Sequence, residues 1–305
     1  MEPTPSKMES VETRISDSST SPSEPPGYYD RVPNSHVFFP PKYPTPGPKP
    51  STAESYEKVA KKFSRQKEVK GICSQDPILD DNPTELWRFL LSNLRSPSLA
   101  VLLLGTHTES SSSTDSNGHS TTTTRTVTDF SFQFDVSKYV MPQWSRIVAE
   151  PRKASKGEAT PMPTVLETLE EYTSSKNPFK EFRLDKLVLW DMERVTQLLT
   201  DLARSTGYQH TIQVHFPMQH YKVVALASNG YSKAAHNKAV QVLCVVSCLW
   251  ILFWPAWSIA RKRMKNRLSC EYGMAVSADE FYSRNAQRIH SAVVQRCKSE
   301  QMVAW

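Results

Sequence analysis

The chain has 305 residues, of which 38% are hydrophobic and 22% are charged, and its formal net charge is +6. This length leaves room for one soluble domain of ordinary size together with tails. The positive charge is not concentrated as in nucleic-acid-binding proteins, because part of it comes from one short run at 261–267. Its five cysteines lack the spacing of a zinc site or a disulfide framework. We therefore expect no nucleic acid partner, no metal and no cofactor.

Residues 1–52 are rich in proline and serine and predict a disordered leader. The first residues lack an apolar core and do not form a signal peptide. The leader carries the P-P-x-Y sequence twice, at 25–28 and at 40–43. Paired prolines favour an extended polyproline II ribbon, which loses little entropy when it docks into an aromatic groove.

These two motifs resemble the ligands of WW domains, including the WW domains of HECT-type ubiquitin ligases. The resemblance implies that the motif prolines and tyrosines bind a partner: Pro25, Pro26, Tyr28, Pro40, Pro41 and Tyr43. The motifs begin fifteen residues apart, so tandem WW domains can bind both of them, and the second step becomes intramolecular. The alternative is a disordered leader without this role.

Residues 53–80 are expected to form a linker, in which 53–67 can form a short basic helix. An α+β domain then occupies 81–230. Its first helix should begin at Asn82, because Asn82 suits an N-cap and Pro83 suits the first helical position. Alternating apolar residues predict a hairpin of strands 99–107 and 125–137, with Phe130, Phe132, Phe134 and Val136 on one face. The Ser/Thr-rich residues 108–124 between these strands, and the polar residues 152–163, predict disordered loops.

The second half of the domain continues the mixed pattern. Helices are predicted at 164–174 and 191–205, and a strand at 179–190 in which a slip brings Leu187 and Leu189 to the buried side. A last hairpin is expected from 211–216 and 221–228. Because several strands are consecutive, the pattern predicts an α+β fold with a mostly antiparallel sheet and flanking helices.

The stretch Ala239–Ala260 contains 22 residues without a formal charge. As a helix it would measure about 33 Å, enough for the ~30 Å hydrocarbon core of a bilayer. We therefore expect a single transmembrane helix; the alternative is a buried core helix. The tryptophans and basic residues at its end would form an interfacial membrane anchor: Trp250, Trp254, Trp257, Arg261, Lys262 and Arg263. Residues 261–305 would then be a basic juxtamembrane run and an amphipathic tail, with a helix at 277–299 capped by Ser277.

The topology of this anchor is ambiguous from the sequence. The basic run after the hydrophobic stretch places the C-terminus in the cytosol, whereas the P-P-x-Y motifs require a cytosolic leader. We rank a single span with a cytosolic N-terminus first, a shallow monotopic insertion that turns near Pro255 second, and an outside N-terminus third. A membrane of the endomembrane system, with the soluble domain facing the cytosol, is the expected location.

Catalytic signatures are missing from the sequence. The nine glycines form neither a G-x-G-x-x-G, a P-loop nor a G-x-S-x-G motif. Three histidines, His210, His215 and His220, gather near the last predicted hairpin and are interpreted as surface residues. Asp129 and Asp135 are expected to face solvent. We therefore predict a protein that is not an enzyme.

Three stretches behind the Pro/Ser-rich leader, ELWRFLL, TDFSFQFDVSKYV and LCVVSCLWILFWPAW, are similar to uncharacterised fungal membrane proteins with one C-terminal hydrophobic segment. This resemblance is one of layout and implies no activity. The working hypothesis is a membrane-anchored, non-enzymatic adaptor that recruits WW-domain partners. The alternative is an α+β domain that binds or modifies a lipid or small molecule at a membrane surface, with a leader that is merely disordered.

Overall fold

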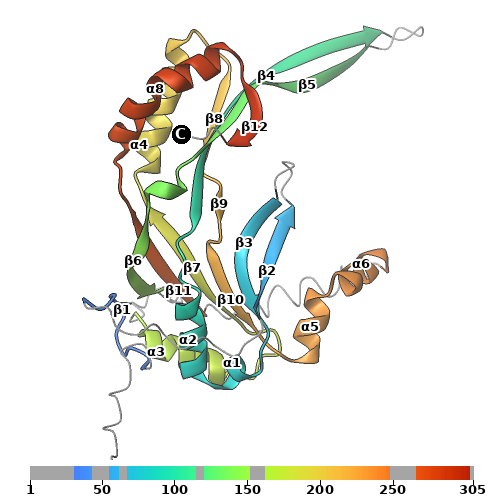
Figure 1. Ribbon diagram of the computed structural model, residues 1–305. Coiled ribbons are helices and arrows are strands. Elements are labelled where there is room, and N and C mark those ends of the chain that lie inside the picture. Colours follow the sequence, from blue (N-terminus) through green and yellow to red (C-terminus); the bar gives the residue numbers. More distant parts are fainter. Residues whose placement is uncertain are drawn as a thin grey trace, which may run out of the picture.

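The computed structural model describes residues 31–42, 55–61, 67–114, 120–151, 162–247 and 266–302. These residues form two β-sheets and their covering helices (Figure 1). The seven-stranded sheet has the order β1 (Val37–Phe38), β6 (Val140–Ala149), β11 (Asn266–Met274), β7 (Glu181–Leu189), β10 (Lys222–Leu226), β3 (Lys67–Ser74) and β2 (Ser55–Lys61). The second sheet has the order β12 (Lys298–Met302), β5 (Ser120–Asp135), β4 (Ser98–Thr114) and β8 (Thr211–His215), and β9 (Met218–Gln219) also pairs with β4.

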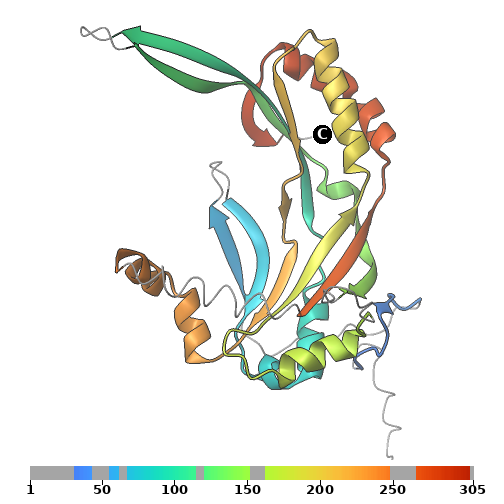
Figure 2. The same ribbon diagram turned by 180° about the vertical axis from the view of Figure 1, so that it is seen from behind.

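The helices divide between the two sheets. Helices α1 (Ile78–Asp81), α2 (Pro83–Ser92) and α3 (Val165–Ser174) lie at the seven-stranded sheet, whereas α4 (Met192–Ser205) and α8 (Ala278–Val294) pack together beside the second sheet (Figures 1 and 2). A short 3-10 turn, η2 (Ser137–Tyr139), links β5 to β6. Helices α5 (Gly230–His236) and α6 (Lys238–Val246) follow β10. Buried side chains from both sheets form one continuous hydrophobic core.

Helix starts follow the local signals in the sequence. Asn82 Oδ1 accepts hydrogen bonds from the backbone N–H groups of Thr84 (2.9 Å) and Glu85 (3.2 Å), and Pro83 is the first residue of α2. Asp191 and Ser277 cap α4 and α8 in the same way. Each cap satisfies backbone donors that the first helical turn leaves unpaired. The predicted helix starts at these three positions are confirmed.

The α+β class is confirmed, but the prediction of a mostly antiparallel sheet is wrong. Strands β3 and β10, β7 and β11, and β5 and β12 run parallel, while the remaining pairs are antiparallel. Two of these parallel pairs involve β11 and β12, which the sequence analysis assigned to a C-terminal tail. β11 instead lies between β6 and β7 inside the sheet. Parallel partners are distant in sequence, so no local pattern shows them.

Other strands also differ from the prediction. The expected short helix at 53–67 is wrong, since β2 and the first residue of β3 occupy the described part of this range. The hairpin predicted from 211–216 and 221–228 does not form: β8 pairs with β4, whereas β10 pairs with β3 and β7 in the other sheet. His220, with φ of 56°, lies between β9 and β10. Strands β8 and β9 follow successive parts of β4 in the same direction, so the chain passes from one sheet to the other without the turn back that a hairpin needs.

The predicted hairpin of β4 and β5 is confirmed, but it is much longer than expected. The pairing continues from Ala100 with Asp135 to Thr114 with Ser120, so most of the Ser/Thr-rich stretch predicted to be a loop is paired strand. The distal part projects from the body as a two-stranded ribbon (Figure 1). We call residues 108–114 and 120–126 the arm; their described side chains are all exposed. Threonine has a high strand propensity, which suits this extended pairing.

The leader is not disordered throughout, because residues 31–42 are held by the fold. Phe38 is buried, and its ring lies 5.3 Å from Trp87 and 5.6 Å from Trp144, measured between ring centroids. The backbone N–H groups of Ala149 and Val165 donate to the carbonyls of His36 and Ser35. These contacts anchor β1 at the edge of the sheet beside β6.

The predicted single transmembrane helix is a further error. In the part of the chain that the structure describes, no helix is long and apolar enough to cross a bilayer. Helix α6 covers the start of the predicted span but ends at Val246 after nine residues, which corresponds to about 13 Å. The prediction rested on an uncharged composition, which does not specify where a helix ends.

The strand register gives a physical reason for this correction. Leu226, at the end of β10, pairs with Glu181 of β7, and Asn266, at the start of β11, pairs with Phe182 of the same strand. We call residues 227–265 the excursion and these two strand ends its roots. Strands on either side of β7 are about 10 Å apart. A single membrane crossing would place the roots on opposite sides of a bilayer, which this sheet does not allow.

The predicted slip in β7 is also wrong. Phe182, Leu184, Lys186 and Val188 alternate into the core without interruption, whereas Leu187 and Leu189 are 43% and 51% exposed. The unbroken alternation buries Lys186, which is 3% exposed.

Candidate functional site

The structure brings together a group of polar side chains at the base of the arm, which we call the Asp129 cluster. His107 and Glu109 come from β4, Asp129 from β5, and Tyr208 and His210 from the loop between α4 and β8. Asp129 is 5% exposed, so the expectation that it faces solvent is wrong. Its neighbours are drawn from segments far apart in the sequence.

A β-bulge turns Asp129 inward. Gly105 pairs with Phe130 and Thr106 pairs with Thr128, so Asp129 has no direct partner across the hairpin. A bulge breaks the alternation of a strand and re-aims one side chain. A methyl group on Gly105 would lie 2.3 Å from the ring of Phe130, so only glycine lets this ring pack here. This glycine inside a predicted strand is the one sequence signal that could have indicated the bulge.

Two donors bind the Asp129 carboxylate. His107 Nδ1 lies 2.9 Å from Oδ1 and 2.8 Å from Oδ2, and the hydroxyl of Tyr208 donates to Oδ2 at 2.7 Å. Burial alone would raise the pKa of Asp129, but the hydrogen bonds from His107 and Tyr208 outweigh it, and the pKa is lowered. The carboxylate is therefore ionised at neutral pH.

The second nitrogen of His107 also faces a carboxylate. Nε2 lies 3.2 Å from Glu109 Oε1, and Glu109 in turn lies 3.6 Å from Arg125. Hydrogen bonds with Asp129 and then with Glu109 raise the pKa of His107 above 6.5. Both ring nitrogens can donate only when the imidazole is protonated. This arrangement fits a charged histidine held between two acids, which is unlike a general base with one free nitrogen.

The loop that supplies Tyr208 is fixed by the end of α4. Gly207 adopts φ of +86°, the left-handed conformation in which a glycine commonly ends a helix. Arg204 Nη1 donates to the carbonyls of Tyr208 (3.0 Å) and His210 (2.8 Å). The His210 ring lies 5.3 Å from that of His107.

Arg296 completes the positive side of the cluster. It lies in the turn between α8 and β12, at φ of 50°, and its charge helps to lower the pKa of Asp129.

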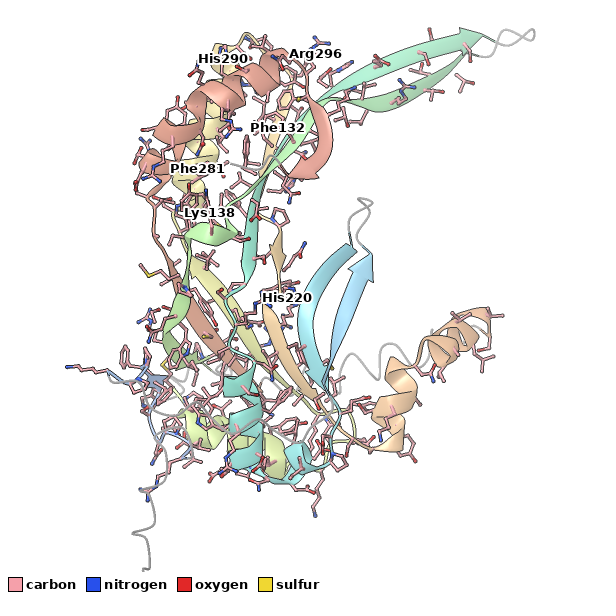
Figure 3. The ribbon with its side chains drawn as sticks, in the orientation of Figure 1. Phe132, Lys138, His220, Phe281, His290 and Arg296 are labelled. Atoms are coloured by element: carbon pink, nitrogen blue, oxygen red, sulfur yellow. The ribbon has the colours of Figure 1, made fainter. Side chains whose placement is uncertain are left out.

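The histidines grouped in the sequence analysis do not stay together. His215 contacts Gln213 on β8, and His220 lies well apart from Arg296 (Figure 3).

A buried lysine forms a second polar feature. Lys186 is 3% exposed, and its Nζ donates to the carbonyl of Arg95 at 2.6 Å, which ties the loop after α2 to β7. Burial lowers the pKa of Lys186 to about 8, with Cys270 on β11 opposing and Arg95 adding to that effect. Burial also raises the pKa of the Cys270 thiol to about 12. An inert thiol and an ammonium bound to a carbonyl indicate a structural role.

Most of the predicted partner-binding and anchor residues lie outside the described residues. This applies to the first motif, to Tyr43 and to the anchor: Pro25, Pro26, Tyr28, Tyr43, Trp250, Trp254, Trp257, Arg261, Lys262 and Arg263. Pro40 and Pro41 are described; they begin two residues after the end of β1 and are half-buried, and the next residue, Lys42, is exposed.

Within the described residues, no group of three or more histidine, cysteine, aspartate or glutamate side chains is arranged to hold a metal ion. The similarity in layout to fungal membrane proteins stays a prediction. No protein-family model, no curated protein and no solved structure matches this chain.

Proposed function

We propose that this chain is an adaptor that recruits WW-domain proteins, with HECT-type ubiquitin ligases as one class of partner. The observation that carries the proposal is the repeated P-P-x-Y motif at 25–28 and 40–43. In P-P-x-Y ligands of WW domains the prolines dock as a polyproline II ribbon and the tyrosine fills a second pocket. Two motifs on one chain allow a bivalent partner to bind far more tightly than a single site does.

The anchoring of β1 supports this proposal by giving the second motif a fixed origin. Pro40 comes two residues after Phe38, whose ring is buried beside Trp87 and Trp144. Proline suits this position because it cannot extend the hydrogen bonding of an edge strand. A partner bound there would sit directly against the edge of the seven-stranded sheet.

Because Pro40 and Pro41 are half-buried, we also expect the two motifs to bind WW domains with unequal affinity. A WW groove contacts the faces of both prolines, so docking at the second motif must displace whatever covers them in the folded chain. The second motif should therefore bind more weakly in the full chain than in an isolated peptide of residues 20–48.

The test is a binding titration of the full chain against a tandem WW protein. The variants are Tyr28→Ala, Tyr43→Ala and both together, and the matched control is Tyr29→Ala, which alters a neighbouring tyrosine outside the motif position. We expect Tyr43→Ala to weaken binding by about 10²-fold through lost bivalency, Tyr28→Ala to weaken it further because only the partly covered second motif remains, and the double substitution to abolish binding. Equal binding by the double variant and the control would refute recruitment through these motifs.

The alternative function, in which the α+β domain binds or modifies a lipid or small molecule, stays a prediction. If the double Tyr→Ala variant binds as well as the control does, this alternative becomes the next to test.

A further inference from the structure

The start of the excursion is rigidly fixed to the folded body. Both the backbone N–H and the hydroxyl of Ser228 donate to Asp80 Oδ2 at 2.7 Å. Asp80 is buried, and its Oδ1 accepts a hydrogen bond from the hydroxyl of Tyr172 at 2.9 Å. Asn229 Nδ2 donates to the carbonyl of Pro178 at 2.7 Å, and Asn229 Oδ1 caps α5. Helix α5 therefore leaves the body from a defined point.

Helix α6 exposes three large apolar side chains: Val242, Leu243 and Val246 are 62%, 66% and 77% exposed. Val242 and Val246 are four residues apart and share one face of the helix, with Leu243 beside them. Both views show α5 and α6 standing away from the two sheets (Figures 1 and 2). A contiguous exposed apolar group of this kind indicates a contact surface.

The sequence that follows this face favours a lipid surface as its partner. The chain continues without a formal charge to Ala260, includes three tryptophans, and then carries five lysines and arginines within 261–267. Tryptophan favours the interface between lipid and water, and basic residues attract anionic headgroups. A bilayer surface offers partners for the apolar face and for the basic run together, whereas an apolar protein groove would match only the former.

The dimensions favour contact with the surface over a crossing. Helix α6, at about 13 Å, covers less than half of the ~30 Å hydrocarbon core. Two full crossings would return the chain to its roots, but they need about 40 apolar residues. The uncharged run has 22. An interfacial helix instead buries its apolar face only about 5–10 Å deep.

We propose that α6 docks on the surface of an anionic lipid bilayer through Val242, Leu243 and Val246, with both roots of the excursion on the same side. The folded body and the basic run then face the same leaflet. This removes the conflict between the positive-inside rule and a cytosolic leader. The proposal does not depend on recruitment of WW domains.

The test is flotation of the full chain with vesicles of phosphatidylcholine alone and with about 30% phosphatidylserine. The variant is Val242→Asp with Leu243→Asp, both at exposed positions, and the matched control is Val294→Asp on α8, where the valine is 58% exposed. Thermal unfolding followed by circular dichroism checks that each variant folds. Size-exclusion chromatography without lipid checks for self-association.

We expect the wild type and the control to float with the phosphatidylserine vesicles, and the double variant to lose at least about tenfold of the bound fraction. Binding to phosphatidylcholine alone should be weaker, because the basic run has no anionic partner there. Failure of the wild type to float would overturn the proposal, as would equal flotation of the double variant. Self-association of the wild type that is lost in the double variant, without flotation, would assign the face to a second copy of this chain and would also overturn it.

Discussion

Replacing Lys186 with methionine should stabilise the protein at neutral pH. The ammonium is buried, and its pKa falls from 10.5 to about 8. Each pKa unit corresponds to about 1.36 kcal/mol, so burying the charged form costs about 3 kcal/mol. Methionine has a similar length and removes this cost, but it leaves the carbonyl of Arg95 without its hydrogen bond from a charged donor, a loss of about 2 kcal/mol. The expected net gain for Lys186→Met at pH 7 is about 1 kcal/mol.

The sign of the pH dependence gives an independent check. The pKa of Lys186 is lower in the folded protein than in the unfolded chain, so between about pH 8 and pH 10.5 the unfolded chain binds more protons. Stability from this residue therefore rises with pH across that window, while below pH 8 its cost is fully present. Between pH 7 and 9.5 the wild type should gain about 2 kcal/mol from Lys186, and Lys186→Met should lack this gain.

The assay is urea denaturation at pH 7 and 9.5, followed by circular dichroism. Lys176→Met, at an exposed position, is the matched control and should unfold as the wild type does at both values. The reasoning fails if Lys186→Met is less stable than the wild type at pH 7. It also fails if the variant keeps the pH dependence of the wild type.

Two further predictions concern the base of the arm. In the variant Asp129→Asn, the pKa of His107 should fall toward 6.5, which NMR of the imidazole ring can follow. The control Asp135→Asn, on the same strand, should leave the pKa of His107 unchanged. An unshifted pKa in Asp129→Asn would contradict the assigned ion pair. The stability that the raised pKa of His107 contributes is complete below pH 6.5 and is lost as the pH rises through the folded value, whereas the contribution of Asp129 is lost as the pH falls through its lowered pKa. Gly105→Ala should destabilise the protein by about 1–3 kcal/mol in urea denaturation, because the added methyl group meets the buried ring of Phe130; wild-type stability in this variant would show that the ring can move.

Local signals in the sequence determined where helices begin. Asn82, Asp191 and Ser277 each cap a helix through backbone N–H groups two or three residues away, so a short window of sequence contains the whole interaction. The pairing of β4 with β5 was also accessible, because the two strands are neighbours with clear alternation. The P-P-x-Y motifs belong to this level as well, since they are read from four consecutive residues.

Pairing between distant strands was decided only by the tertiary structure. β11 lies between β6 and β7, although the sequence places it after an uncharged stretch that suggested a membrane span. Composition reports that a segment is apolar, but it does not report whether the segments on either side of it return to the same sheet. The register of Leu226 and Asn266 against adjacent residues of β7 supplies that information.

Neither the Asp129 cluster nor the burial of Lys186 could be predicted from the sequence, for the same reason. A single bulge reverses the direction of Asp129, and the partners that it then meets come from three separate segments. Lys186 is tolerated in the core because a carbonyl far away in the sequence accepts a hydrogen bond from its ammonium group. The sequence by itself determines features whose interacting groups are a few residues apart. Only the fold decides which distant groups meet, because the free energy that buries a charge or fixes a strand comes from partners that no local window contains.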